Sequence, residues 1–185
     1  MIQFIGLIGA VVCLLLGWQF PWSKTPLIMG LCYGLASLGV SIMMRAGQVS
    51  FGHALFAAIG AYMLERADFE TTLLVMVVVA SVAMVWWVQR FFKSAAGEAL
   101  AGIKSNETRL EYLGMSAKSI MWQAYVLSAL LVGLSGGLFA MVQGLVTPDI
   151  GAWFRSGEYV FIAVLGGSGH AMGAYLGAVV FEVVK

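Results

Sequence analysis

Two histidines are the side chains of this sequence best suited to acid–base or metal chemistry. His53 and His170 each follow a glycine and lie in uncharged runs. A metal site would need further ligands at suitable spacing, and neither histidine has them nearby. Ionisable groups within a membrane are functional candidates, but imidazole also forms hydrogen bonds between helices. We favour the structural hydrogen bond, and we keep an intramembrane enzyme or passive channel that uses these histidines as an alternative.

Motifs for hydrolysis or nucleotide binding are missing from the sequence. It contains neither Gly-x-Ser-x-Gly nor His-Glu-x-x-His. The run GGSGH at residues 166–170 is rich in glycine but lacks the Gly-Lys-Ser/Thr ending of a phosphate loop. Cys13 and Cys32 lie in apolar runs and are expected to be buried thiols. We therefore predict no enzyme, no catalytic residue, no metal site and no cofactor bound by this chain.

A small set of polar side chains could line a solute pathway. These are Ser37, Ser41, Gln48, Ser50 and His53. They can form hydrogen bonds, but they do not supply a charge that would select a solute. Ser37 and Ser41 lie one turn apart on one helix face, and serines in membrane helices also bond to their own backbone. That structural alternative stays open.

The composition indicates an integral membrane protein. Of the 185 residues, 61% are hydrophobic and 10% are charged, against roughly 25% charged residues in soluble domains. The net charge of +1 gives no basic face for nucleic acid. A bilayer core of about 30 Å requires roughly 20 apolar residues per helix. We expect an all-α protein of about six apolar segments in one transmembrane domain (1–185), namely residues 1–20, 26–44, 47–64, 71–89, 119–148 and 159–181.

Two of these segments are candidates for broken or re-entrant helices that line a cavity. Residues 47–64 contain His53, and residues 159–181 are interrupted by glycines. The placement of Lys and Arg predicts that residues 90–118 and both chain termini face the cytoplasm. If either weak segment does not cross the membrane, one terminus changes side.

Residues 90–118 form the most hydrophilic long run of the chain. The run holds five of the ten Lys/Arg residues together with three glutamates. Two stretches of good helix formers, 98–104 and 108–113, lie between Gly97 and Gly114. Four apolar side chains at helical spacing form a stripe: Leu100, Ile103, Leu110 and Leu113. A short amphipathic helical element between membrane spans is best explained as a docking surface for a partner.

Glycines four residues apart predict close helix packing. They include Gly133 with Gly137, and the series Gly169, Gly173 and Gly177. Such small-xxx-small faces allow helix backbones to approach closely in lipid. We expect packing within one subunit, with a pathway lining or a dimer contact as the alternative.

Several motifs, in one order, resemble those of the branched-chain amino-acid permeases of ATP-binding cassette importers, specifically the M-type subunit. They are AGQVSFGHA (46–54) with GAY (60–62), GEALAGIKSNE (97–107) with EYLG (111–114), VLSA (126–129) with GLSGGL (133–138), and VLGGSG (164–169). The similarity covers about residues 30–64 and 88–181. Relative to the family pattern, the centre between residues 64 and 89 and the carboxyl end are shorter.

The resemblance implies an importer subunit of the cell inner membrane that works by alternating access. Its implied partners are cytoplasmic ATPase subunits that bind the ATP, an H-type permease subunit, a periplasmic solute-binding protein and the lipid bilayer. The implied ATPase-docking residues are Glu98, Leu100, Ile103, Asn106, Glu107, Leu110, Leu113 and Gly114. The shortened centre leaves a transport-incompetent scaffold or fragment as an alternative, and a urea or short-amide importer is another.

Overall fold

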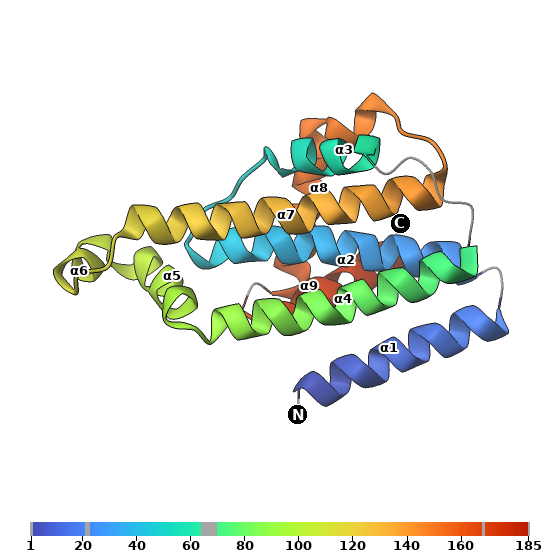
Figure 1. The fold of residues 1–185 in the computed structure, drawn as a ribbon, viewed down its shortest axis with the longest axis horizontal. Helices are drawn as coiled ribbons and strands as arrows, with labels where there is room; N and C mark the ends of the chain where they lie inside the picture. Colours follow the sequence, from blue (N-terminus) through green and yellow to red (C-terminus); the bar gives the residue numbers. More distant parts are fainter. Residues whose placement is uncertain (1, 21–22, 64–69, 168, 185) are drawn as a thin grey trace.

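The protein is a bundle of helices, described here from a computed structural model that covers residues 2–20, 23–63, 70–167 and 169–184 (Figure 1). The elements are α1 (Ile2–Gln19), α2 (Lys24–Arg45), α3 (His53–Met63), α4 (Glu70–Phe92), α5 (Ala95–Ser105), α6 (Glu107–Tyr112), α7 (Ala117–Gln143), the 3-10 helix η2 (Pro148–Gly151), α8 (Trp153–Gly166) and α9 (Ala171–Val184). The predicted all-α membrane class is confirmed.

Helix α2 lies at the centre of the bundle. It packs against α7, α9, α8 and α4, and its residues from Cys32 to Met43 are all buried. An apolar helix that is buried all round is typical of a membrane protein core. The surrounding elements therefore depend on α2 for their positions.

Within the part of the chain that the structure describes, three single helices are long and apolar enough to cross a membrane: Lys24–Arg45, residues 74–92 of α4, and Ala117–Gln143. They correspond to three of the predicted segments. Helix α3 has 11 residues, which is about 16 Å and too short to cross alone. Helices α8 and α9 would form a fourth span only as a pair, and they meet at 111°. Broken segments were predicted at both of these places.

The bend between α8 and α9 affects the predicted position of the carboxyl terminus. Figure 1 shows the C-terminal end in the half of the bundle remote from α5 and α6. A straight span over residues 159–181 would have brought it to their end of the bundle. Arg66 and Lys185, which also entered the prediction of orientation, lie outside the described residues.

A Schellman motif ends α2 and separates it from α3. Gly47 adopts the left-handed conformation with φ of 76°. Its N–H donates to the Met44 carbonyl at 3.0 Å, and the Gln48 N–H donates to the Met43 carbonyl at 3.2 Å. The chain then continues without regular helix until His53. The predicted segment 47–64 is therefore an irregular stretch followed by a short helix.

Glycines bring α3 and α7 into backbone contact. A Cβ at Gly60 would overlap the Gly133 carbonyl, and a Cβ at Gly136 would overlap the Ala57 carbonyl. The prediction paired Gly133 with Gly137. Gly137 is buried in α7, but Gly136 is the residue that meets Ala57. The backbone contact with α3 is therefore made by Gly133 and Gly136.

The second glycine contact joins α8 to α9. A Cβ at Gly173 would overlap the Gly166 carbonyl, and a Cβ at Gly177 would overlap the Ile162 carbonyl. Packing through Gly173 and Gly177 is thus confirmed. Gly169 lies exposed in the turn with nothing within 4 Å of its Cβ position, so its predicted packing role is wrong.

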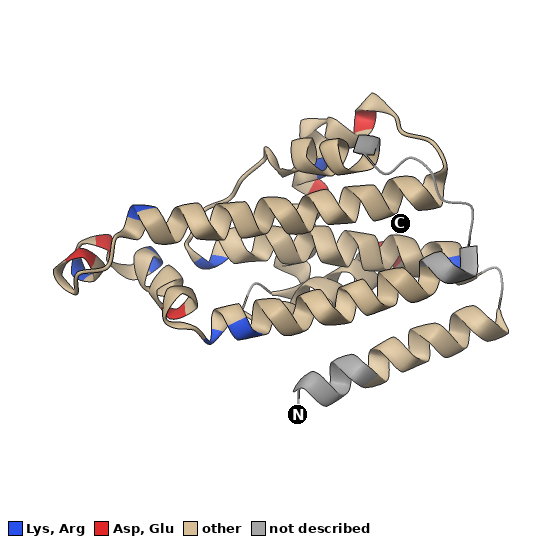
Figure 2. Cartoon of the chain, in the orientation of Figure 1, with Lys and Arg blue, Asp and Glu red and all other residues tan. Residues whose placement is uncertain are grey.

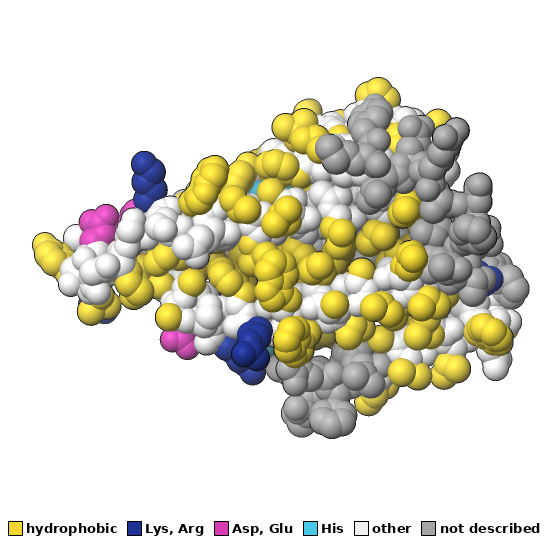
Figure 3. All heavy atoms as spheres, in the orientation of Figure 1, with side chains coloured by type: hydrophobic (Ala, Val, Ile, Leu, Met, Phe, Trp, Pro, Cys, Tyr) yellow, Lys and Arg dark blue, Asp and Glu magenta, His cyan; other side chains and the backbone are white. Residues whose placement is uncertain are grey.

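The charges gather at one end of the bundle. Figure 2 shows Lys, Arg, Asp and Glu around α5, α6 and the adjoining ends of α4 and α7. Figure 3 shows that hydrophobic side chains dominate the long sides of the molecule in this view. A charged end next to an apolar flank agrees with a bundle that lies in a bilayer with α5 and α6 in water.

The α3–α7 contact predicts that Gly136→Ala is destabilising. The added Cβ must displace the Ala57 backbone, which should lower the free energy of unfolding by about 1–3 kcal/mol. Gly157→Ala in α8 is the matched control, because its Cβ would meet nothing within 4 Å. The control should be neutral or gain up to about 1 kcal/mol from helix propensity. Equal unfolding free energies for both variants in detergent micelles would contradict the contact.

Candidate functional site

The amino end of α3 carries a buried hydrogen-bond chain. His53 is fully buried, and its Nε2 lies 2.6 Å from Ser128 Oγ on α7. Ser128 Oγ donates in turn to the Gly39 carbonyl on α2 at 2.6 Å. Since a hydroxyl has one proton, His53 must donate through Nε2–H. This chain confirms the predicted structural hydrogen bond from His53 to a neighbouring helix.

Further contacts hold the same end of α3. The Ala54 N–H donates to Ser156 Oγ on α8 at 2.8 Å, which satisfies one of the amide groups that a helix start leaves unpaired. The His53 ring meets Phe56 and Tyr125 edge to face, with centroids 5.9 and 5.7 Å apart. Nδ1 of His53 is buried and forms no well-aligned hydrogen bond with a described residue, although the Ser50 backbone lies beside the ring. These contacts hold the imidazole in place between α2, α3 and α7.

The five predicted pathway residues do not come together around one space. Gln48 is exposed and Ser50 is half-buried, whereas Ser37, Ser41 and His53 are buried. Ser41 Oγ donates to the Leu38 carbonyl at 2.7 Å, as in the structural alternative. Ser37 Oγ has no hydrogen-bond partner in the described part of the chain. None of the five lines either of the two cavities described below.

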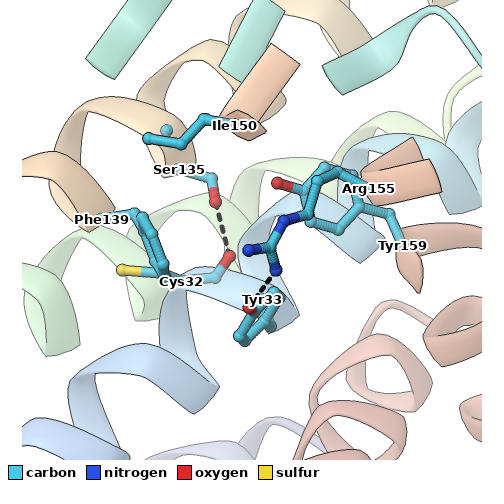
Figure 4. Close-up of a pocket in the computed structure, with 8 residues that line it drawn as sticks. Cys32, Tyr33, Ser135, Phe139, Ile150, Arg155 and Tyr159 are labelled. Atoms are coloured by element: carbon cyan, nitrogen blue, oxygen red, sulfur yellow. Dashed lines mark hydrogen bonds between the residues drawn. The ribbon is translucent and has the colours of Figure 1, made fainter. Parts of the chain in front are cut away.

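A small cavity lies between α2, α7, α8 and η2 (Figure 4). Its volume is about 10 Å³, which is about the space of one water molecule. Arg155 Nη1 donates to Tyr33 Oη at 3.1 Å and to Glu158 Oε2 at 3.0 Å. The Ser135 hydroxyl donates to the Cys32 carbonyl at 2.6 Å. These bonds tie α8 and α7 to α2 and place a guanidinium beside the cavity.

The stretch 90–118 contains two short helices that form an elbow, a name kept here for α5 and α6 together. The predicted start after Gly97 was late: α4 continues to Phe92, and Ser94 caps α5 by accepting from the Gly97 N–H at 3.3 Å. Asn106 Oδ1 accepts from the Arg109 N–H at 3.1 Å and begins α6. Gly114, with φ of 78°, ends it. Capping residues thus set each boundary of the elbow.

The apolar stripe of the elbow faces inward for most of its length. Leu100 and Leu110 are buried and Ile103 is partly buried against the core, so in this arrangement these three cannot supply an exposed docking face. The exposed members of the predicted set are Glu98, Asn106, Glu107, Leu113 and Gly114. Tyr112, which was not predicted, is 88% exposed beside Leu113 at 69%.

Several residues that hold the site were not predicted from the sequence. They are Tyr33, Ser128, Ser135, Arg155 and Ser156. Ser128 and Ser135 lie seven residues apart in an uncharged run, a spacing that places both on one helix face. This spacing could have identified the two serines as candidates for bonds to a neighbouring helix. Arg155 and Ser156 had none, because their partners are about 100 residues away in the chain.

The His53–Ser128 bond should give measurable coupling in a double-mutant cycle of His53→Phe and Ser128→Ala. Hydrogen bonds between membrane helices contribute about 0.6 kcal/mol on average and up to about 1.7 kcal/mol, and we expect coupling in that range. The control replaces His53→Phe by His170→Phe, because His170 is exposed in the turn before α9. Coupling in the control cycle, or none in the first cycle, would contradict the bond.

The sequence of this chain is similar to those of known transport proteins. A family model described as "Branched-chain amino acid transport system / permease component" matches residues 64–185. The high-affinity branched-chain amino acid transport system permease proteins LivM of Escherichia coli and of Salmonella typhimurium are 31% and 32% identical to this chain over 98 residues. Each alignment covers 53% of this chain and 23% of the relative. No solved structure matches the chain.

The matched residues include the elbow, α7, and the glycine-packed pair α8 and α9. The chain therefore belongs to the family of branched-chain amino acid transport system permease components.

Proposed function

We propose that this chain is a permease subunit of an ATP-driven importer of branched-chain amino acids in the cell inner membrane. The elbow would dock on a separate cytoplasmic ATPase subunit. The observation that carries the proposal is the tip of the elbow, where Tyr112 and Leu113 are exposed at the charged, water-facing end. Large apolar side chains exposed there are typical of a contact surface for another protein.

The elbow is attached firmly enough to transmit a movement. Leu100 of α5 is fully buried in the main core, and Leu110 of α6 is buried in the same cluster. Gly97 lies against the backbone of Phe91 and Phe92 at the end of α4. A displacement of the elbow would therefore move α4 and α7 with it, because packed interiors shift as units.

A second connection runs from the elbow to the α2–α3 segment. The Gly47 Cβ position lies 3.2 Å from Lys104 Cγ of α5. Gly47 begins the irregular stretch that leads to His53 and its chain of hydrogen bonds. We propose that ATP-driven movement of the elbow reaches the bundle interior by this route, as alternating access requires.

The remaining partners are proposed from the family. They are a second permease subunit of the H type and a periplasmic binding protein that delivers the solute. The predicted cytoplasmic amino terminus remains a prediction, and no cofactor is assigned to the chain. The cargo is proposed from the printed names of the relatives, which describe high-affinity branched-chain amino acid transport.

Charge reversal on the elbow tests the docking. Glu98→Lys with Glu107→Lys should lower co-purification with the ATPase and solute-stimulated ATP hydrolysis at least about tenfold, because charged pairs at an interface contribute about 1.5 kcal/mol or more. Asp149→Lys in η2 is the control, since it is exposed and η2 packs on α3 and α8 and not on the elbow. Unchanged association for the elbow variant would refute the docking.

Uptake by proteoliposomes separates the importer from its alternatives. Vesicles that contain this chain with its ATPase, H-type permease and binding protein should accumulate labelled leucine only when ATP is supplied. ATPase assembly without uptake of any solute would identify a scaffold. Uptake of urea or a short amide in place of leucine would keep the transporter and change its cargo.

A further inference from the structure

A large apolar groove opens between α1, α2, α4 and α9, away from the hydrogen-bonded site. Its volume is about 590 Å³, and its walls are residues 9–13, 23–31, 78–89 and 172–183. Gly9 and Gly30 border it, and a Cβ at either position would meet nothing within 4 Å. The groove is therefore unfilled by the chain's own side chains.

The groove also contains buried polar atoms. Ser81 is 4% exposed, and the Tyr175 hydroxyl lies beside it. The Ser81 and Tyr175 hydroxyls face each other, so they partly satisfy one another. Glu182 is half-buried, and its Oε2 is buried with no hydrogen-bond partner among the described residues. An unpaired carboxylate oxygen attracts a cation or a strong donor. The occupant should therefore be mostly apolar, with a cationic group at the Glu182 end.

Glu182 lies at the end of the groove where the cationic group would bind. Tyr175 packs against Gly34 of α2, and the groove is lined by earlier residues of α2 and later residues of α9. The two helices thus run antiparallel, and Glu182, two turns after Tyr175, lies level with the start of α2. The ends of α2 and α9 meet there, where a bundle that crosses a membrane reaches the head-group region.

The dimensions favour a single hydrocarbon chain over a helix. The wall formed by residues 172–183 extends about 16 Å, close to half of the roughly 30 Å hydrocarbon core. The groove also closes where Leu74 packs on Gly17, so a rigid cylinder cannot lie along α1 and α4.

We propose that one acyl chain of a phospholipid occupies this groove and that the lipid's ammonium head group binds Glu182. Phosphatidylethanolamine has this chemistry. Ser81 and Tyr175 would bond to polar atoms near the glycerol, and the terminal part of the chain would lie along Val82–Trp86 and Gly9. The site does not depend on the transport proposal, because none of its residues belongs to the elbow or to the His53 chain.

Native mass spectrometry of the purified protein tests the proposal. The protein is exchanged with phosphatidylethanolamine and phosphatidylglycerol of identical acyl chains in equal amounts, and bound lipids are counted. The wild type should retain phosphatidylethanolamine about tenfold over phosphatidylglycerol, as a charge-assisted hydrogen bond implies. Glu182→Gln should bring the two lipids to about equal retention.

Gly30→Leu should fill the groove and reduce retention of both lipids about tenfold. Gly157→Leu is the matched control, because it adds the same side chain at a helical glycine with equally open surroundings outside the groove. It should leave retention unchanged. If wild type and Gly30→Leu retained the same amount of lipid, the site would be refuted. It would also be refuted if Gly30→Leu kept its lipid and instead lost a bound second copy of the chain or a partner subunit. An unchanged preference in Glu182→Gln would overturn the head-group assignment.

Discussion

Two serine hydroxyls fix α7 against α2, and the other functional elements are attached to these two helices. Ser128 donates to the Gly39 carbonyl and Ser135 to the Cys32 carbonyl, each at 2.6 Å. The donors and the acceptors are both seven residues apart, so the two bonds define one antiparallel register. Membrane helices gain little hydrophobic energy from association in lipid, and hydrogen bonds and close packing decide how they pair. The Gly39 Cβ position lies 2.8 Å from the Ser128 carbonyl, which leaves no room for a side chain.

The pair also explains how distant parts of the chain reach one another. Ser128 connects α7 to α2 and to His53 of α3 in one chain of bonds. Ser156 and Arg155 attach α8 to α3 and α2. The elbow packs on the amino half of α7 through the core that contains Leu100. A change at the water-facing end therefore has a continuous packed route to the buried polar groups.

The sequence was sufficient for the class, the long helices and the elbow, because these depend on local hydrophobicity and on charge. It also indicated both broken segments, since His53 and the glycine-rich run at 166–169 interrupt the apolar pattern. It did not reveal which glycine meets which helix. Spacing alone could not distinguish Gly136 from Gly137, because the crossing angle of α3 and α7 decides it.

The exposure of the elbow's apolar stripe also could not be predicted from residue spacing. Leu100 and Leu113 share a helical spacing in the sequence, yet Asn106 divides the stretch into two helices and only Leu113 is exposed. Asparagine is a residue type that often caps helices, but the sequence did not show that a cap at Asn106 would divide the stripe between two helices. Arg155 and Tyr33 meet across 122 residues, and no local pattern indicates such a pair.

The elbow, seated on α2 and α7, is predicted to face the cytoplasm, where an ATPase could reach it. Lys104 is exposed on α5, and a Lys104→Cys variant can be treated with a membrane-impermeant maleimide. We predict labelling in inverted membrane vesicles and none in intact cells. Labelling of residue 104 from outside intact cells would place the elbow on the opposite side of the membrane and contradict the account.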